Sequence, residues 1–256
     1  MNRRLVLAFG LLVVFAASAG CSSVFGPDQI AQKKLERNAS YEWDTEQDVT
    51  YNVSSDEYRA IYDLGGKTTL EIHQQEALGE KAPVEISAVK FRYANGTVVG
   101  ADDIRVRKTK SKTIITPPKG KGKLAYTAPR RGKTFSVPTY LKDRSYEVII
   151  PRGMRVDLFL LSDVRPGNYK TEMRDGRVHI VWDKSINPDA ISVRYYLARD
   201  KFIFGGVVGV ALLVGLAGLA YFRLQIRQLE REREELGLNV DVSDDDFGDD
   251  PPPGMR

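Results

Sequence analysis

FIFGGVVGVALLVGLAGLAYF, at residues 202–222, is a run of 21 residues without one charged side chain. A helix rises about 1.5 Å per residue, so a helix of this length crosses a hydrocarbon core of about 30 Å. A core helix of a soluble protein would be shorter or would alternate with polar residues. The stretch therefore predicts a single transmembrane helix, with a long body before it and a short charged tail after it.

The residues that flank this span predict its orientation. Arginines at positions 223, 227, 231 and 233 follow it, whereas Arg199 and Lys201, with Asp200 between them, precede it. The larger excess of basic residues stays in the cytoplasm. We therefore expect a cell-membrane protein with the body outside, a cytoplasmic helix at 223–238 and a disordered acidic tail at 239–256.

The first 20 residues have the layout of a signal peptide with a lipobox. Arg3 and Arg4 precede a 15-residue apolar segment, and small residues lead up to Cys21, the one cysteine of the chain. Two processing routes stay open: lipidation of Cys21, which we favour, or ordinary signal-peptide cleavage after Ala19. Residues 21–40 are polar and mixed in charge, and we expect them to form a linker.

Residues 41–198 are predicted to form one extracytoplasmic domain. Short apolar segments alternate with turn residues, and the dipeptides Asn95-Gly96 and Asp175-Gly176 are strong hairpin signals. This pattern predicts an antiparallel β-sandwich. Ser54 and Glu57 have the spacing of a capping box, which predicts a short helix that ends near Asp63. We expect the core to include Val156, Leu158, Leu160, Val178, Ile180, Trp182, Ile191, Val193 and Tyr195.

The last predicted strand, residues 191–197, runs almost directly into the span. We therefore expect the domain to sit on the bilayer by its C-terminal end. Gly205 and Gly209 form a G-x-x-x-G pattern inside the span, which is one route to a homodimer. Three Asn-x-Ser/Thr sequons are possible glycosylation sites outside the membrane, at Asn38, Asn52 and Asn95.

Positive charge is concentrated in residues 104–133. Residues 22–201 contain 31 basic and 24 acidic side chains, a net charge of +7, and this stretch alone contains 11 basic residues and no acidic one. It predicts a patch that binds membrane lipids, anionic surface polymers or acidic envelope proteins; the equally weighted alternative is a sheet edge protected by lysines. The patch consists of Arg105, Arg107, Lys108, Lys110, Lys112, Lys119, Lys121, Lys123, Arg130, Arg131 and Lys133.

One row of this patch has a specific expected geometry. If the segment is one extended strand, Lys108, Lys110 and Lys112 fall on a single face. Aromatic residues are sparse around them, which argues against binding of single-stranded nucleic acid by base stacking.

Catalytic and metal motifs do not assemble in this sequence. His73 and His179 each stand alone in strand-like segments, and two histidines with one cysteine make a conventional zinc site improbable. We therefore expect no cofactor, no metal site and no enzymatic activity.

Several short motifs resemble a known family. They are AGC at 19–21, YEVIIPRGM at 146–154, RPGNY at 165–169, VHIVWD at 178–183 and the C-terminal DDDFGDDPPPGMR. With the single span, they resemble an uncharacterised family of single-pass surface lipoproteins of halophilic archaea, a domain of unknown function. The resemblance implies the architecture above and no known activity or ligand. One difference is that such surface domains are usually strongly acidic.

The sequence leaves three function hypotheses. The first is a non-enzymatic module of the cell envelope that binds or anchors surface material. The second is a receptor-like adaptor, in which the state of the outer domain alters the cytoplasmic helix and tail. The third, ranked lowest, is a hydrolase whose site is assembled from scattered residues.

Overall fold

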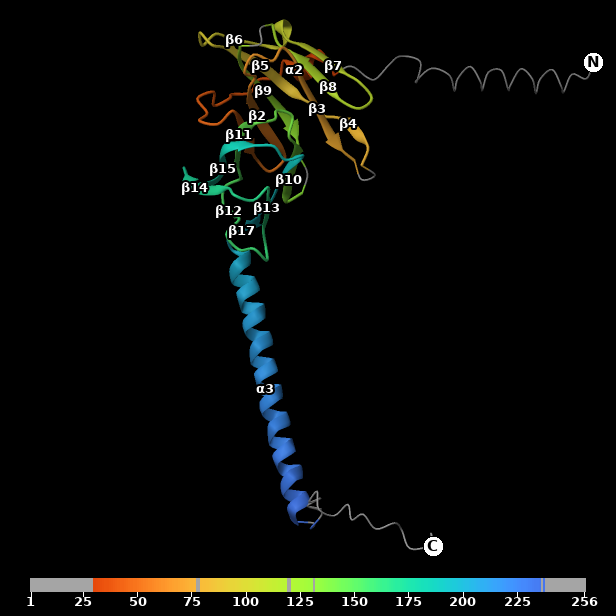
Figure 1. Ribbon diagram of the computed structural model, residues 1–256, viewed down its shortest axis with the longest axis vertical. Helices are drawn as coiled ribbons and strands as arrows, with labels where there is room; N and C mark the ends of the chain where they lie inside the picture. The colour runs from red at the N-terminus through yellow and green to blue at the C-terminus, as the bar shows by residue number, and fades with distance from the viewer. Residues whose placement is uncertain (1–29, 77–78, 119–120, 131, 236, 238–256) are drawn as a thin grey trace, which may run out of the picture. The chain divides into compact units, whose positions relative to one another are not determined.

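The computed structural model describes residues 30–76, 79–118, 121–130, 132–235 and 237 (Figure 1). The chain forms two compact units, residues 1–198 and 199–256. The described part of the first unit is mainly β, and a long apolar helix accounts for the second, as the sequence predicts. Cys21 lies outside the described residues, as do the predicted signal peptide and the predicted acidic tail.

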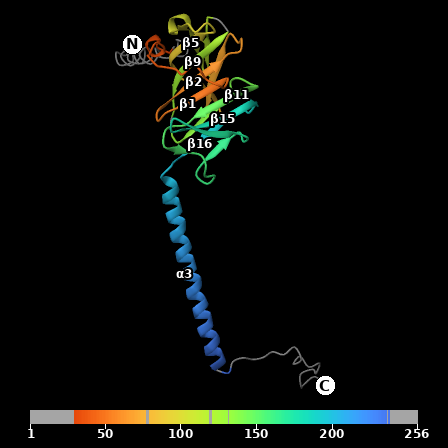
Figure 2. The ribbon, with the colours of Figure 1, turned by 90° about the vertical axis from the view of Figure 1, so that its left-hand side faces the viewer.

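An eight-stranded sheet forms the frame of the β domain. Its strand order is β14-β15-β11-β1-β2-β9-β5-β6, and the strands from β15 to β5 are labelled in Figure 2. In chain order the strands are β1 (Val49–Val53), β2 (Glu57–Asp63), β5 (Ser87–Tyr93), β6 (Val98–Val99), β9 (Gly122–Pro129), β11 (Arg144–Ile149), β14 (Lys170–Arg174) and β15 (Arg177–Ile186). Every pairing in this sheet is antiparallel except that of β1 with β11, which is parallel and departs from the expected all-antiparallel arrangement.

Three smaller sheets complete the domain. A four-stranded sheet has the order β4-β3-β8-β7, a three-stranded sheet the order β10-β16-β13, and β12 pairs with β17. Their strands are β3 (Leu70–Gln75), β4 (Lys81–Pro83), β7 (Arg105–Lys108), β8 (Thr113–Thr116), β10 (Thr134–Pro138), β12 (Met154–Arg155), β13 (Asp163–Arg165), β16 (Ala190–Arg194) and β17 (Tyr196–Leu197). A 3₁₀ turn, η1 (Ala101–Asp103), precedes β7.

The core lies between the inner face of the eight-stranded sheet and the smaller sheets. Alternation along each strand directs one set of side chains inward: on β1 this set includes Tyr51, whose ring lies 5.3 Å from that of Phe135 on β10. Trp182 on β15 is buried, and its indole N–H donates to the Pro166 carbonyl at 3.1 Å. Ile191 and Val193 on β16 are also buried, as predicted.

A cluster of tyrosines occupies the middle of this core. The hydroxyl of Tyr62 lies 3.1 Å from that of Tyr51 and 3.0 Å from that of Tyr126, so three buried phenols satisfy one another. Burial raises the pKa of each of these three hydroxyls well above its usual range. It also raises the pKa of the neighbouring Tyr58 to about 12.

The segment before β1 packs against the domain. A single helical turn, α2 (Gln32–Leu35), buries Leu35, and Ala39 is buried as well. The amine of Lys90 donates to the Ala39 carbonyl at 2.7 Å. Residues 30–40, which the sequence assigns to a linker, therefore belong to the folded unit.

Two predictions about local structure are wrong. Residues 57–63 form β2 rather than a helix, because Ser54 closes a turn instead of a capping box: its backbone N–H donates to the Glu57 carbonyl at 2.9 Å. Leu160, a predicted core residue, is 55% exposed, and Leu158 is only partly buried, because β12 ends at Arg155 and residues 159–161 form a turn. Val156, which precedes that turn, is buried as predicted.

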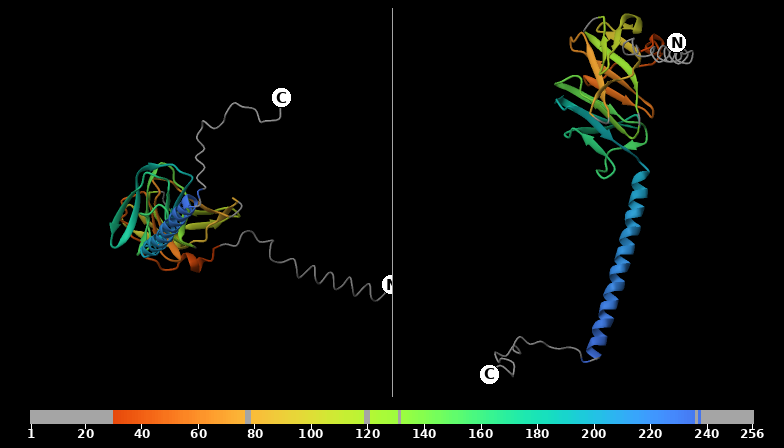
Figure 3. Two further views of the ribbon diagram at one scale, coloured as in Figure 1. Left: turned by 90° about the horizontal axis from the view of Figure 1, so that it is seen from below. Right: turned by 90° about the vertical axis from the view of Figure 1, so that its right-hand side faces the viewer.

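The second unit contains one uninterrupted helix, α3 (Asp200–Glu235), of 36 residues (Figure 3). It is long and apolar enough to cross a membrane, which supports membrane association. The predicted span at 202–222 and residues 223–235 of the predicted helix that follows it are thus parts of one helix.

Candidate functional site: a polar cleft on the outer face of the large sheet

A cleft of about 530 Å³ opens on the outer face of the eight-stranded sheet. Side chains of β1, β2, β11 and β15 form its floor, and residues 40–46 border it. A second cleft, of about 580 Å³, lies beside β3 and β10. Of the two clefts, the first is lined by a buried charged side chain, that of Glu147. No buried charged side chain is among the described residues that line the second.

Strand alternation places polar residues on this face. Thr50 and Asn52 on β1 point opposite to Tyr51, and Glu147 on β11 points opposite to Tyr146 and Val148. The register places Thr50 beside Glu147 across the parallel pair. His179 on β15 lies two pairs further along, opposite Ile149.

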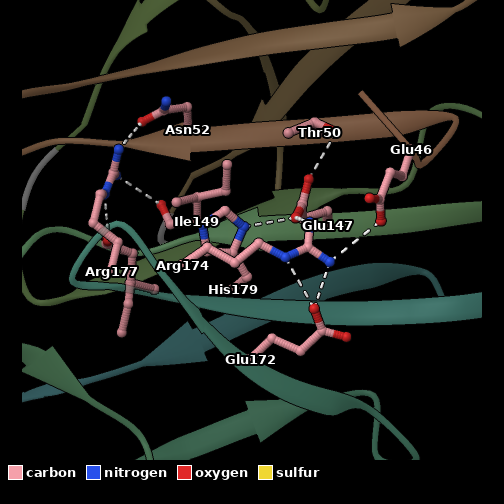
Figure 4. Close-up of polar contacts among 10 residues, drawn as sticks. Glu46, Thr50, Asn52, Glu147, Ile149, Glu172, Arg174, Arg177 and His179 are labelled. Carbon is pink, nitrogen blue, oxygen red and sulfur yellow. Dashed lines mark hydrogen bonds and ion pairs between the residues drawn. The ribbon is translucent and has the colours of Figure 1, made fainter. Parts of the chain in front are cut away.

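Glu147 is the centre of the network in Figure 4. One carboxylate oxygen lies 2.8 Å from Nδ1 of His179 and 3.9 Å from a guanidinium nitrogen of Arg174. The other oxygen accepts a bond of 3.3 Å from the hydroxyl of Thr50. A buried carboxylate is costly unless it is paired, and these partners supply that pairing.

Arg174 connects this buried pair to the open part of the cleft. Besides Glu147, its guanidinium contacts Glu172, with Nε at 3.0 Å, and Glu46, at 3.2 Å. The hydrogen bond with Glu172 is the largest cause of a raised pKa for Arg174. A single exposed guanidinium thus links β14 to the segment before β1.

Arg177 fixes three strands to one another at the other end of the cleft. It donates to Asn52 at 2.8 Å, to the Val53 carbonyl at 2.7 Å and to the Ile150 carbonyl at 3.0 Å. Burial, followed by the nearby charge of Arg152, lowers the pKa of Arg177. Its donors are committed to the fold, so Arg152, which is exposed at the same rim, is better placed to meet a ligand.

The segment that borders the cleft is itself held by hydrogen bonds. The Tyr41 hydroxyl donates to the Ala88 carbonyl at 2.6 Å and lies 2.8 Å from the hydroxyl of Thr127, and burial raises the Tyr41 pKa to about 12. The amine of Lys123 donates to the Trp43 carbonyl at 2.8 Å. This segment is therefore fixed by side chains of β9 and by a backbone carbonyl of β5.

The His179–Glu147 pair has one feature of an acid–base site, an imidazole oriented through Nδ1 by a carboxylate. A nucleophile would need to lie within hydrogen-bond distance of that imidazole. Among the residues that the structure describes, no hydroxyl is hydrogen-bonded to His179, and the Thr50 hydroxyl is directed at Glu147 instead.

The three sequons differ in their surroundings. Asn38 and Asn95 are exposed, and the side chain of Asn95 accepts a bond of 3.0 Å from the Thr97 backbone within the predicted hairpin turn. Asn52 instead lies in the cleft, where its side chain accepts from Arg177. A glycan on Asn52 would break this bond and fill the cleft.

The basic stretch does not form the predicted row of lysines. β7 ends at Lys108 and β8 begins at Thr113, so Lys110 lies in the connecting turn and the three lysines do not share a strand face. Lys108 pairs with Glu85 at 3.6 Å, and Lys112 pairs with Glu71 at 2.6 Å. The local excess of positive charge is therefore partly neutralised by acidic residues distant in the sequence.

Other members of the stretch have different environments. Lys123 is directed at the segment beside the cleft, and Arg130 lies over the ring of Tyr195, with its guanidinium carbon 5.5 Å from the ring centre. Lys119 and Arg131 lie outside the described residues. The exposed members are Arg105, Arg107, Lys110, Lys121 and Lys133. Within the domain, β7 and β8 lie at the end opposite β12 and β17 (Figure 1).

Sequence reasoning missed the network around Glu147. His179, which stands alone in a strand-like segment of the sequence, is hydrogen-bonded to Glu147 in the structure. The missed signal is a run of polar residues that alternate with buried ones in three separate strands. Gly205 and Gly209 lie on α3, where their four-residue spacing places them on one face.

Comparison with known families finds one match. The model of a family of unknown function, DUF5803, matches residues 45–241, which include nearly all of the β domain and α3. Comparisons with curated proteins and with solved structures find no match.

Proposed function

The chain belongs to this family, which assigns it no activity, and we propose that it is a membrane-anchored, non-enzymatic module of the cell envelope that binds a glycan in the polar cleft. The observation that carries the proposal is the composition of the cleft around Glu147. Guanidinium groups of Arg59, Arg152 and Arg174 line the cleft together with carboxylates, among them the exposed Glu46.

A hydroxyl-rich ligand fits such a wall best. Each sugar hydroxyl both donates and accepts, whereas a guanidinium only donates and a carboxylate only accepts. A polyanion would be repelled by the carboxylates, and a strongly cationic peptide would be repelled by the arginines. The sequence-based proposal of an anionic surface polymer at residues 104–133 thereby becomes secondary, because part of that charge is paired.

A binding assay on the full-length protein in lipid nanodiscs tests this function. The probes are two neutral polysaccharides, mannan and dextran, and one polyanion, hyaluronate. We expect a neutral polysaccharide to bind, and the double variant Arg59→Ala, Glu46→Ala to weaken binding by about tenfold or more, because each charged hydrogen bond contributes about 1.5–3 kcal/mol. The matched control is Arg105→Ala, Glu80→Ala, which removes one exposed residue of each sign outside the cleft. Equal losses for both pairs, or binding of hyaluronate alone, would contradict the proposal.

The placement of the module also belongs to this proposal. The basic excess after the span favours a β domain outside the cell membrane and a cytoplasmic C-terminus. Lipidation of Cys21 would add a second anchor. Protease added to intact cells should digest residues 40–198 and spare an epitope placed after Arg256. The opposite pattern would reverse the orientation, and a mature N-terminus at Gly20 would exclude the lipid.

One observation favours the receptor-like adaptor as a second candidate. α3 continues without interruption from Asp200 to Glu235, so the membrane-spanning part and the following charged part are one rigid element. A change in helix association would then extend through the whole element, and Gly205 with Gly209 offers a contact surface for it. The adaptor is supported if crosslinking between copies of residues 223–235 changes when a glycan binds. If crosslinking is unaffected by the ligand, the adaptor is contradicted and the binding module is the candidate that stands.

A further inference from the structure

The turn that follows β12 exposes the most apolar surface of the β domain. Phe159 is 80% exposed and Leu160 is 55% exposed, and no described large hydrophobic residue is more exposed than Phe159, even on α3. Elsewhere in the domain the exposed large hydrophobic residues are isolated, at Val98 and Met173. Two adjacent exposed hydrophobic side chains at the tip of a turn need a partner that shields them from water.

Hydrogen bonds hold this turn in a defined conformation. Leu161 and Ser162 both donate their backbone N–H groups to the Leu158 carbonyl at 2.9 Å. The Ser162 hydroxyl donates to the Val156 carbonyl at 2.8 Å, and both of these residues are buried. The base is thus closed by hydrogen bonds, and Phe159 and Leu160 are presented at a fixed position.

The turn is attached to the part of the domain from which the chain continues into α3. Arg155 pairs with Tyr196 in the β12–β17 ladder, and the Ala198 N–H donates to the Gly153 carbonyl at 2.9 Å. The Tyr196 hydroxyl also donates to the carboxylate of Asp157, at the start of the turn. Tyr196 and Phe202, the first residue of the apolar run, are separated by only six positions, which span at most about 20 Å.

We propose that Phe159 and Leu160 insert into the bilayer interface and hold the β domain against the membrane in which α3 is anchored. A lipid surface is the partner that the chain itself keeps within reach, in either orientation of the protein. Arg165, which follows the turn in the chain, has a side chain that is 75% exposed and suits the phosphate groups of lipids. An aromatic and an aliphatic side chain with a basic neighbour is the composition of interfacial membrane anchors.

The proposal rests on membrane association and is independent of the glycan cleft. It also replaces the predicted membrane role of the part of the basic stretch in β7 and β8, because these two strands lie at the other end of the domain (Figure 1). Failure of glycan binding would leave the anchoring turn unaffected, and failure of anchoring would leave the cleft unaffected.

Tryptophan fluorescence of the full-length protein in nanodiscs tests the proposal. Phe159→Trp and Leu160→Trp each place an indole at the turn, and these exposed positions do not contribute to the core. The nanodiscs contain phosphatidylcholine brominated on the acyl chain near the headgroup, which quenches only nearby indoles. We expect a blue-shifted emission and a loss of intensity beyond that of the wild-type chain, whose Trp43 and Trp182 provide the background.

The control is Val98→Trp, an exposed apolar position on β6 in the same domain. Quenching of both turn variants without quenching of the control supports the insertion. If neither turn variant is quenched more than the control, the turn does not enter the bilayer and the proposal is overturned. Equal quenching at all three positions would overturn it as well, because the domain would then contact lipid without using this turn.

Discussion

The two faces of the eight-stranded sheet differ in the kind of polar group that they bury. The inner face buries tyrosines and Trp182 against the smaller sheets, and its polar atoms are hydroxyls and one indole N–H. The outer face buries a carboxylate, Glu147, and surrounds it with an imidazole and a guanidinium. Uncharged polar groups suffice where packing alone is required, whereas the outer face retains charged groups at the edge of an open cleft.

The aromatic groups of the inner face and the charged groups of the outer face contribute differently to stability. Aromatic packing contributes through buried area and through the geometry of ring pairs. A buried ion pair is weak evidence for stability, because the cost of removing charge from water offsets much of the attraction. The charged network on the outer face is therefore weak evidence for stabilisation, which agrees with the binding role proposed for the cleft.

The largest expected effect is loss of the inner face at high pH. Burial raises the pKa of Tyr58 to about 12, and it also raises those of Tyr51, Tyr62 and Tyr126 well above their usual range. In the unfolded chain each phenol titrates near about 10. The contribution of Tyr58 is complete below a pH of about 10 and is lost as the pH rises through about 12, at about 1.4 kcal/mol per pH unit. The other three tyrosines act in the same direction.

Melting temperatures of the full-length protein in detergent between these pH values measure this loss. Tyr58→Phe should make the decline less steep, because phenylalanine does not titrate. An identical dependence on pH for the wild type and the variant would show that the cluster does not control alkaline unfolding.

A pair of tryptophan substitutions compares the two faces directly. Trp182→Ala removes a buried ring and its indole hydrogen bond, and should cost about 3–5 kcal/mol of unfolding free energy. Trp43→Ala, in the segment on the outer face, should cost much less, because Trp43 is partly exposed and its backbone carbonyl still accepts from Lys123. Thermal unfolding of both variants is the measurement. Similar losses of unfolding free energy in the two variants would mean that Trp43 stabilises the domain as much as Trp182 does.

The network on the outer face should respond more weakly. Glu147→Ala leaves Thr50 and His179 without their acceptor and should cost about 1–3 kcal/mol. The double variant with His179→Ala should cost less than the sum of the single variants, because the two residues share one interaction. Additive losses in thermal unfolding would show that the pair is not coupled.

Much of the fold follows from local signals in the sequence. The Asp175-Gly176 hairpin forms as predicted, with positive φ angles of 50° and 73° that glycine and aspartate tolerate. The apolar span also has an unambiguous local pattern. The helix predicted from Ser54 fails because the same spacing also serves a β-turn, and pairing with β1 and β9 outweighs the local preference.

The candidate site could not be predicted from the sequence, because it depends on register. Thr50 and Glu147 are neighbours only through the parallel pairing of β1 with β11, which are separated by about a hundred residues of chain. The exposed turn at Phe159 and Leu160 was missed for a related reason. A short apolar run in a sequence predicts a buried strand, and the run itself does not show whether its side chains face the core or the surface. Both errors concern long-range context and not local propensity.

The smallest expected effect concerns the basic stretch. Lys112 and Glu71 lie 2.6 Å apart, but their side chains are 38% and 51% exposed. An exposed pair gains little from Coulomb attraction and loses side-chain entropy, so Lys112→Ala should cost about 0–1 kcal/mol of unfolding free energy. Its cost should decrease further in high salt, because exposed charges are screened over about 10 Å at 0.1 M. Lys121→Ala is the control, since Lys121 is exposed and has no ion pair among the described residues. A loss above about 2 kcal/mol for Lys112→Ala would show that this pair contributes as much to stability as the Glu147 network. A loss within the range of the control would show that the stretch is a solvated sheet edge. Its unpaired charges would then be free to contact an anionic partner.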